Sequence, residues 1–181
     1  MPLSEATHGA GSNDDEPLPD AAALAEALAV FGVDFVRHER NACLVTLPGE
    51  RRHRTMVWLV LGRHELLTES FVCRAPDENK EEVYGYLLKR NAQLRSVAYT
   101  LDVYGDIHLT GRVGRRGVTT REVDQILGDV LAASDTDFNP ILERGFATSI
   151  RREWAWRENT GQSLHHLMAF RSLVDKDVAT P

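Results

Sequence analysis

Residues 75–113, APDENKEEVYGYLLKRNAQLRSVAYTLDVYGDIHLTGRV, carry a helical pattern that is followed directly by a β-hairpin pattern. Apolar residues recur at three- and four-residue steps from Val83 to Leu94, which predicts an amphipathic helix. Apolar and polar residues then alternate strictly over residues 97–103 and again over residues 107–113, which predicts two half-buried strands. A helix joined to an antiparallel hairpin in this way indicates a fold of the α+β class.

The loop between these two strands sets their register. Pairing Val103 with Ile107 keeps both apolar rows on one face, and it needs a three-residue loop, residues 104–106, with a glycine at its centre. In this register Asp102 faces His108 across the two strands. We interpret this pair as an exposed contact on the sheet, because a catalytic role would need a nucleophile beside it and none can be named.

The rest of the chain adds further hairpins and helices around this unit. Because consecutive hairpins make a sheet antiparallel, we predict an α+β fold with a twisted antiparallel sheet, helices packed on it and a helical C-terminal extension. The further elements that we expect are a helix at residues 21–31, strands at 33–38, 42–47, 55–61 and 66–74, a helix that starts near residue 119 and breaks at Asn139 and Pro140, a helix at 147–159 and a short last helix from residue 163.

Short polar side chains mark the starts of three helices. Asp20 precedes the first helix and is expected to cap it. Asn79 with Glu82, and Thr119 with Glu122, have the spacing of a capping box, in which each side chain binds a free backbone N–H group near the other residue.

Three tryptophans and two arginines are candidate partner-binding residues. The predicted strand Thr55–Leu61, which contains Trp58, is apolar on both faces, so it lies in the centre of a sheet or turns one face toward a partner. Near the C-terminus, Arg and Trp alternate in a way that suits base stacking, cation–π pairs within the protein or a protein interface. We expect at least one of these C-terminal tryptophans to be packed inside. The candidates are Trp58, Trp154, Trp156, Arg151 and Arg152.

Residues 111–117, GRVGRRG, place glycines and arginines just before a predicted helix N-terminus. Free backbone amides and guanidinium groups both favour anions, so Arg112, Arg115 and Arg116 are candidate anion-binding residues. The segment lacks the Lys-Ser/Thr ending and the preceding apolar strand of a phosphate-binding loop. A connection with solvated arginines is the simpler interpretation, and an anion site is the alternative.

Composition narrows the classes of function. The chain has 181 residues, 43% of them hydrophobic, which suits one domain with tails, and it has no apolar run that could span a membrane. No export signal is seen, so we expect a cytoplasmic protein with Cys43 and Cys73 reduced in its core. The net charge is −6, but residues 1–20 hold five acidic and no basic residues, and the near-neutral remainder argues against nucleic-acid binding.

No pattern selects a catalytic or metal site. The seven histidines lack the spacing of metal ligands, and no Ser/His/Asp or Cys/His set can be assembled. We therefore predict no catalytic residue, no metal and no cofactor. A hydrolase or transferase stays an open alternative that would require a buried pocket with convergent polar groups.

Several segments together resemble the YbjN family, in particular its actinobacterial branch. They are DENKEEVYGYLLKRN at residues 77–91, YGDIHL at 104–109, LERGF at 142–146 and RREWAWR at 151–157. The resemblance covers residues 20–173. It implies a fold similar to that of type III secretion chaperones, which are usually dimers that bind extended segments of client proteins. The family is described as sensory transduction regulators, and the resemblance implies no catalytic residues.

Together these observations predict a non-enzymatic protein- or peptide-binding module, a chaperone-like or regulatory adaptor that forms a homodimer and binds neither nucleic acid nor membrane. A small-molecule or anion sensor that uses the Arg112–Arg116 loop is the alternative. We expect a disordered acidic tail at residues 1–19, a YbjN-like α+β domain at 20–146, a helical extension at 147–174 and a frayed tail at 175–181.

Overall fold

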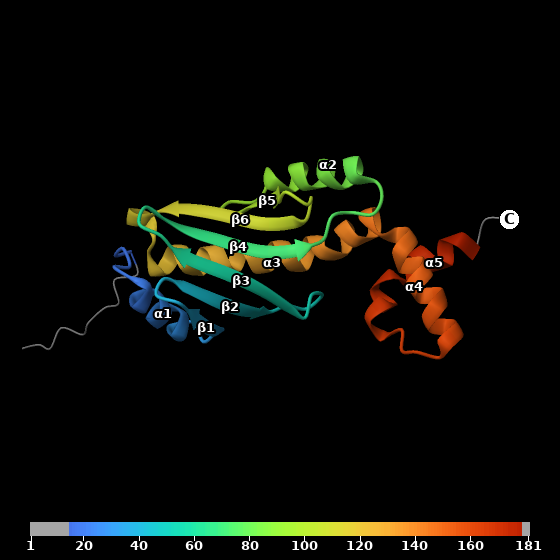
Figure 1. Ribbon diagram of the computed structural model, residues 1–181, viewed down its shortest axis with the longest axis horizontal. Helices are drawn as coiled ribbons and strands as arrows, with labels where there is room; N and C mark the ends of the chain where they lie inside the picture. The colour runs from blue at the N-terminus through green and yellow to red at the C-terminus, as the bar shows by residue number, and fades with distance from the viewer. Residues whose placement is uncertain (1–14, 179–181) are drawn as a thin grey trace, which may run out of the picture.

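The computed structural model describes residues 15–178 of the chain (Figure 1). Helices and strands follow one another in the order expected for an α+β fold. They are α1 (Ala21–Val30), β1 (Asp34–His38), β2 (Ala42–Pro48), β3 (Arg54–Leu61), β4 (Glu65–Cys73), α2 (Lys80–Asn91), β5 (Ala98–Leu101), β6 (Ile107–Gly114), the 3-10 turn η1 (Arg115–Gly117), α3 (Thr120–Gly145), α4 (Ala147–Thr160), the 3-10 helix η2 (His165–Phe170) and α5 (Arg171–Val178).

The six strands form one sheet in the order β1-β2-β3-β4-β6-β5, and all neighbouring strands are antiparallel. The predicted α+β class and antiparallel sheet are therefore confirmed. Helix α3 lies along one face of the sheet, behind the strands in Figure 1, and the C-terminal helices lie beyond one end of the sheet. Buried side chains of α1, α2 and α3 join the inward side chains of the strands in one hydrophobic core.

Strand β3 shows how the two faces of the sheet differ. Thr55, Val57 and Leu59 are fully buried on the helix side, whereas Met56 and Trp58 are exposed on the other side. The strand is central in the sheet, as its two apolar faces predict, yet its second face is not covered by any helix of the described chain.

The β5–β6 hairpin differs from the prediction by two residues in register. Leu101, and not Val103, pairs with Ile107, so the apolar rows still share one face but the loop is longer. The carboxylate of Asp102 accepts hydrogen bonds from two backbone N–H groups in the loop, at 2.8 and 2.9 Å, and this ends the strand early. Val103 is consequently 92% exposed in the loop.

Some of the helix predictions are wrong in detail. Helix α3 continues through Pro140 instead of breaking there, because Asp137 and Ile141 are both buried and packing on either side outweighs the lost backbone hydrogen bond. Asn79 does not cap α2 with its side chain; its amide instead donates to the backbone oxygen of Arg144 at 3.1 Å, which ties α2 to the end of α3. The Asp20 side chain caps α1, as predicted. Thr119 caps α3 by accepting from the Glu122 N–H, but the other half of the predicted capping box does not form, because the Thr119 N–H donates to the oxygen of Gly117 at 3.0 Å.

The two predicted tails overlap the described part of the chain. Residues 15–19, within the predicted acidic tail, lie near the start of α3, where the backbone N–H of Leu18 donates to the oxygen of Val118 at 2.7 Å. Helix α5 spans Arg171–Val178 and so includes the start of the tail that we expect to fray from residue 175. The first fourteen and the last three residues lie outside the described part of the chain.

Candidate functional site

The uncovered face of the sheet gathers apolar side chains from four neighbouring strands. Trp58 lies near its centre, with 37% of its surface exposed, and cross-strand pairing aligns it with Leu44 and Val36 in one row. Phe71 of β4 is 47% exposed. We call this surface the open face; its members are Val36, Leu44, Met56, Trp58, Val60, Leu67 and Phe71.

A polar stripe borders the open face on the side of β6. The His108 ring meets Phe71 edge-on, with ring centroids 5.4 Å apart. Its Nδ1 lies 3.2 Å from the carboxylate of Glu69, and its Nε2 lies 3.9 Å from that of Asp102. The predicted proximity of Asp102 and His108 is thus found, but as a diagonal contact and not as a cross-strand pair. An apolar centre with a polar border is the usual composition of a protein interface.

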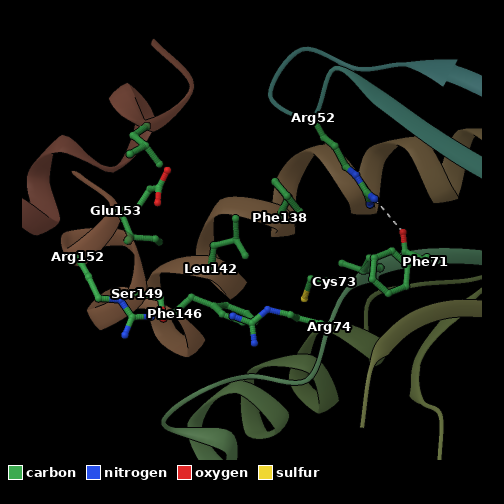
Figure 2. A pocket seen from close by; sticks show the side chains of 13 residues that line it. Arg52, Phe71, Cys73, Arg74, Phe138, Leu142, Phe146, Ser149, Arg152 and Glu153 are labelled. Atoms are coloured by element: carbon green, nitrogen blue, oxygen red, sulfur yellow. Dashed lines mark hydrogen bonds between the residues drawn. The ribbon is translucent and has the colours of Figure 1, made fainter. Parts of the chain in front are cut away.

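A pocket of about 660 Å³ lies where the end of β4 meets α3 and the C-terminal helices (Figure 2). Phe71 belongs both to this pocket and to the open face. Most of the remaining lining is apolar, and the charged residues come from three different segments of the chain. The apolar lining includes Phe138, Leu142, Phe146 and Ile150, and the arginines are Arg52, Arg74 and Arg152.

Asp135 of α3 holds the β2–β3 loop that carries Arg52. Its carboxylate accepts hydrogen bonds from the backbone N–H groups of Glu50, Arg51 and Arg52, at 2.8, 3.2 and 3.1 Å. A Cβ atom on Gly49 would come within 2.5 Å of the same carboxylate, so the close approach of loop and helix requires a glycine. Helix α3 therefore fixes the position of Arg52 at the pocket.

The Arg52 guanidinium is partly buried and only partly paired. Its Nη2 donates to the backbone oxygen of Phe71 at 2.9 Å, and its centre lies 5.1 Å from the ring centroid of Phe138. Its Nη1 is fully buried and has no hydrogen-bond partner in the described chain. Burial lowers the pKa of Arg52, which reflects the cost of holding this charge away from water.

The segment between β4 and α2 fastens the C-terminal helices at the pocket. Arg74 Nη2 lies 2.7 Å from Asp77, and the Arg74 guanidinium stacks 4.8 Å from the centroid of Phe146. Asp77 also accepts a hydrogen bond from the Ser149 hydroxyl at 2.8 Å. The hydrogen bonds from Arg74 and then Ser149 lower the pKa of Asp77 to about 2, so this carboxylate is charged at neutral pH.

The five tryptophan and arginine candidates do not form one cluster. Trp58 is on the open face, whereas the other four are on α4. Trp154 is 6% exposed, in agreement with the expectation that one of these tryptophans is packed, and Trp156 is 48% exposed. Arg151 Nε donates to a backbone oxygen of α5 at 3.0 Å, and Arg152 lines the pocket.

The predicted anion-binding loop makes contacts within the chain. Arg112 forms an ion pair with Glu65. Arg115 donates to the backbone oxygen of Leu18 at 2.8 Å and to that of Pro19, and so holds the segment before α1. Arg116 is exposed. Two of the three guanidinium groups therefore already have acceptors in the described chain.

Sequence reasoning does not select Arg52, Arg74 or Phe71 as site residues. The alternation of β4 places Phe71 on the same face as Leu67, and this signal could have found it. The two arginines become neighbours of one pocket only through the tertiary fold, because they lie in separate loops, and no local pattern indicates their meeting.

Residues 15–178 hold no grouped set of metal-ligating side chains and no exposed cysteine. Both cysteines are free and buried, as predicted, and burial raises the pKa of Cys73 to about 12. Within residues 15–178 no three His, Cys, Asp or Glu side chains are grouped so as to hold a metal ion. Among the helices of the described chain, none is both long and apolar enough to cross a membrane.

Comparisons with known proteins point to one bacterial family. The YbjN family, described as "Putative bacterial sensory transduction regulator", matches residues 20–143. The uncharacterized protein ML2442 of Mycobacterium leprae is 52% identical over 134 residues, which cover 74% of this chain and 73% of that protein. The uncharacterized protein Rv0487 of Mycobacterium tuberculosis is 47% identical over 155 residues, which cover 83% of this chain and 85% of that protein.

Two of the solved structures that are similar to this chain come from Pseudomonas aeruginosa and E. coli. One is the heterodimeric ExoU-SpcU complex of the type III secretion system of Pseudomonas aeruginosa, with a TM-score of 0.47 and 18% identity over 65% of this chain and 96% of that chain. The other is YbjN from E. coli, with a TM-score of 0.47 and 19% identity over 65% of this chain and 93% of that chain.

Proposed function

The chain belongs to the YbjN family, and from this premise we propose that it is a non-enzymatic protein- or peptide-binding module that acts as a chaperone-like or regulatory adaptor. The family description, a regulator of sensory transduction, supports a role that is carried out through another macromolecule. The near-neutral charge of the chain beyond residue 20 favours a protein over a nucleic acid as that partner.

The observation that carries this proposal is the open face. Its seven apolar side chains lie on four adjacent strands, and none of the helices that complete the core covers them. Glu69 lies on the same face, opposite Trp58 in the β3–β4 pairing and between Leu67 and Phe71, so the apolar surface is interrupted on β4. Large apolar side chains gathered on an uncovered face mark a candidate binding surface. Trp58 lies near the centre and belongs to the residue type that most often dominates binding energy. An amphipathic helix or an extended segment of a partner suits such a surface.

The experiment compares two variants in capture of partners from the native cell. Trp58→Glu places a charge in the centre of the open face, and Leu88→Glu makes the same kind of change at an exposed apolar residue of α2, outside the candidate residues. We expect Trp58→Glu to lose partners that both the wild type and Leu88→Glu retain, with thermal unfolding as the check on folding. Identical captured proteins for all three chains would contradict the proposal.

We also propose that the protein is a homodimer, as the sequence analysis expects. Light scattering on the same three proteins tests this. A dimer that becomes a monomer only in Trp58→Glu assigns the open face to a second copy of the chain. A dimer in all three proteins supports pairing elsewhere and leaves the open face to a different protein, and a monomeric wild type contradicts the homodimer.

A further inference from the structure

We propose that the pocket between β4, α3 and α4 binds an organic carboxylate with an apolar chain, of the medium-chain fatty acid class, and that Arg52 binds the carboxylate. This proposal does not depend on the open face. It follows from the lining of the pocket, the balance of charge around it and the unpaired donor of Arg52.

The lining of the pocket suits an apolar chain. Phe138, Leu142 and the C-cap residue Phe146 follow one another at four-residue spacing, so they lie on the same side of α3 and its end. Figure 2 shows these side chains between Arg52 on one side and Arg152 on the other. The pocket is an open groove of about 660 Å³, so a bound chain would lie along the apolar side chains with part of its surface in water.

The charges around the pocket favour an anion. Three arginines and one glutamate, Glu153, line it. Glu153 is already engaged by Arg157, whose Nε lies 2.7 Å from it, and Arg74 is neutralised by Asp77. Arg52 has no carboxylate partner in the described chain, so its positive charge is not balanced locally.

Arg52 also supplies a specific donor. Its Nη1 is buried without an acceptor, and a buried donor in that state costs free energy that a bound acceptor recovers. Its Nη2 and its ring contact already fix the guanidinium plane at the pocket. A carboxylate is the group that best matches the fork of guanidinium N–H donors. Because Nη1 is fully buried in the ligand-free chain, the proposed contact requires the guanidinium to turn about its Nη2 hydrogen bond to Phe71 so that Nη1 faces the pocket.

The probe is decanoate, and the matched control ligand is decylamine, which has the same chain and the opposite charge. We expect calorimetry on the full chain to show binding of decanoate, with decylamine about tenfold weaker or more, because its ammonium group meets the unbalanced arginines. Affinity should rise about two- to fourfold for each methylene from octanoate to decanoate, since about fourfold is the limit for a fully buried methylene and the groove is open. No binding of decanoate below its micelle concentration, or equal binding of decylamine, would overturn the proposal.

Three variants locate the site. Arg52→Gln should weaken decanoate binding about tenfold or more, because the charge-assisted contact is lost. Arg152→Gln, which alters an exposed arginine at the mouth of the pocket, should weaken it about threefold and reduce its salt dependence. Arg63→Gln, in the exposed β3–β4 turn, should leave it unchanged.

Arg52→Gln also removes a hydrogen bond to Phe71, so its thermal unfolding is measured alongside. If Arg52→Gln is unfolded, the decanoate affinity of Arg152→Gln alone tests whether the ligand binds in this pocket. Unchanged affinity in Arg152→Gln and in any folded Arg52→Gln overturns the proposal. Trp58→Glu should still bind decanoate, so failure of the proposed protein-binding function and failure of this site give different results.

Discussion

Asp137 is the residue on which three elements converge. This carboxylate, on α3, has no exposed surface and accepts hydrogen bonds from the hydroxyl of Tyr86 at 2.6 Å and from that of Tyr99 at 2.9 Å. Arg90 Nε of α2 lies 2.7 Å from the same group. Burial, followed by the contact with Asp137, raises the pKa of Tyr86 to about 12, so the tyrosine stays a donor. The network joins α2 and β5 to α3.

Replacing Asp137 with asparagine should destabilise the protein by about 3 kcal/mol, because a buried charge network loses one partner and leaves the arginine uncompensated. Asp124→Asn, an exposed carboxylate on the same helix, is the matched control and should change stability by less than about 0.5 kcal/mol. Urea unfolding of the three proteins measures both effects. Equal midpoints for Asp137→Asn and the wild type would show that the network contributes nothing to stability.

At the scale of elements, the two glycines within α3 have opposite surroundings. Gly128 is exposed, and an added Cβ would meet nothing within 4 Å. Gly145 ends the helix against the β4–α2 segment, where a Cβ would lie 2.9 Å from the Cβ of Pro76 and 3.2 Å from a methyl group of Val83. The backbone oxygen of Gly145 also accepts hydrogen bonds from Asp77 and Glu78. The close contact at this end positions α4.

Alanine at these two glycines should therefore have effects of opposite sign. Gly128→Ala should stabilise by about 0.5–1 kcal/mol through helix propensity. Gly145→Ala should destabilise by about 1–3 kcal/mol, because the added methyl overpacks against the rigid ring of Pro76 and the buried side chain of Val83. Thermal unfolding measures both changes. If both substitutions stabilise the protein, the end of α3 is not packed as closely as the distances indicate.

How far sequence predicts these elements depends on whether the deciding contact is local. The alternation in β5 and β6 predicts their shared apolar face, because side-chain direction is set within each strand. Their register depends on the loop, where the Asp102 carboxylate binds two backbone groups that periodicity does not reveal. Likewise Pro140 should break an isolated helix, and only packing on the sheet keeps α3 continuous.

At the scale of the whole molecule, the open face depends on patterns within single strands, whereas the pocket depends on contacts between distant segments. The open face is predictable in part, because the Thr55–Leu61 strand is apolar on both faces and the helices of one core cover only one face of a sheet. The pocket is not predictable, since it forms where a loop after β2, the end of β4 and α4 meet. Trp154 and Trp156 illustrate the limit: the sequence predicts that at least one of them is packed, and the structure identifies Trp154 as the buried one.

The match to the family ends at residue 143, just before α4 begins, although the hydrophobic core extends into the C-terminal helices through Ile150 and Phe170. A chain that ends at Phe146 tests whether the extension is a separate addition. We expect it to keep its antiparallel sheet in circular dichroism and to melt at a lower temperature, because the pocket face of α3 becomes exposed. The truncated chain should still capture the partners whose binding depends on Trp58, and it should no longer bind decanoate. A truncated chain that fails to fold would instead make the C-terminal helices an obligatory part of the core, and the boundary near residue 146 would then not be a domain boundary.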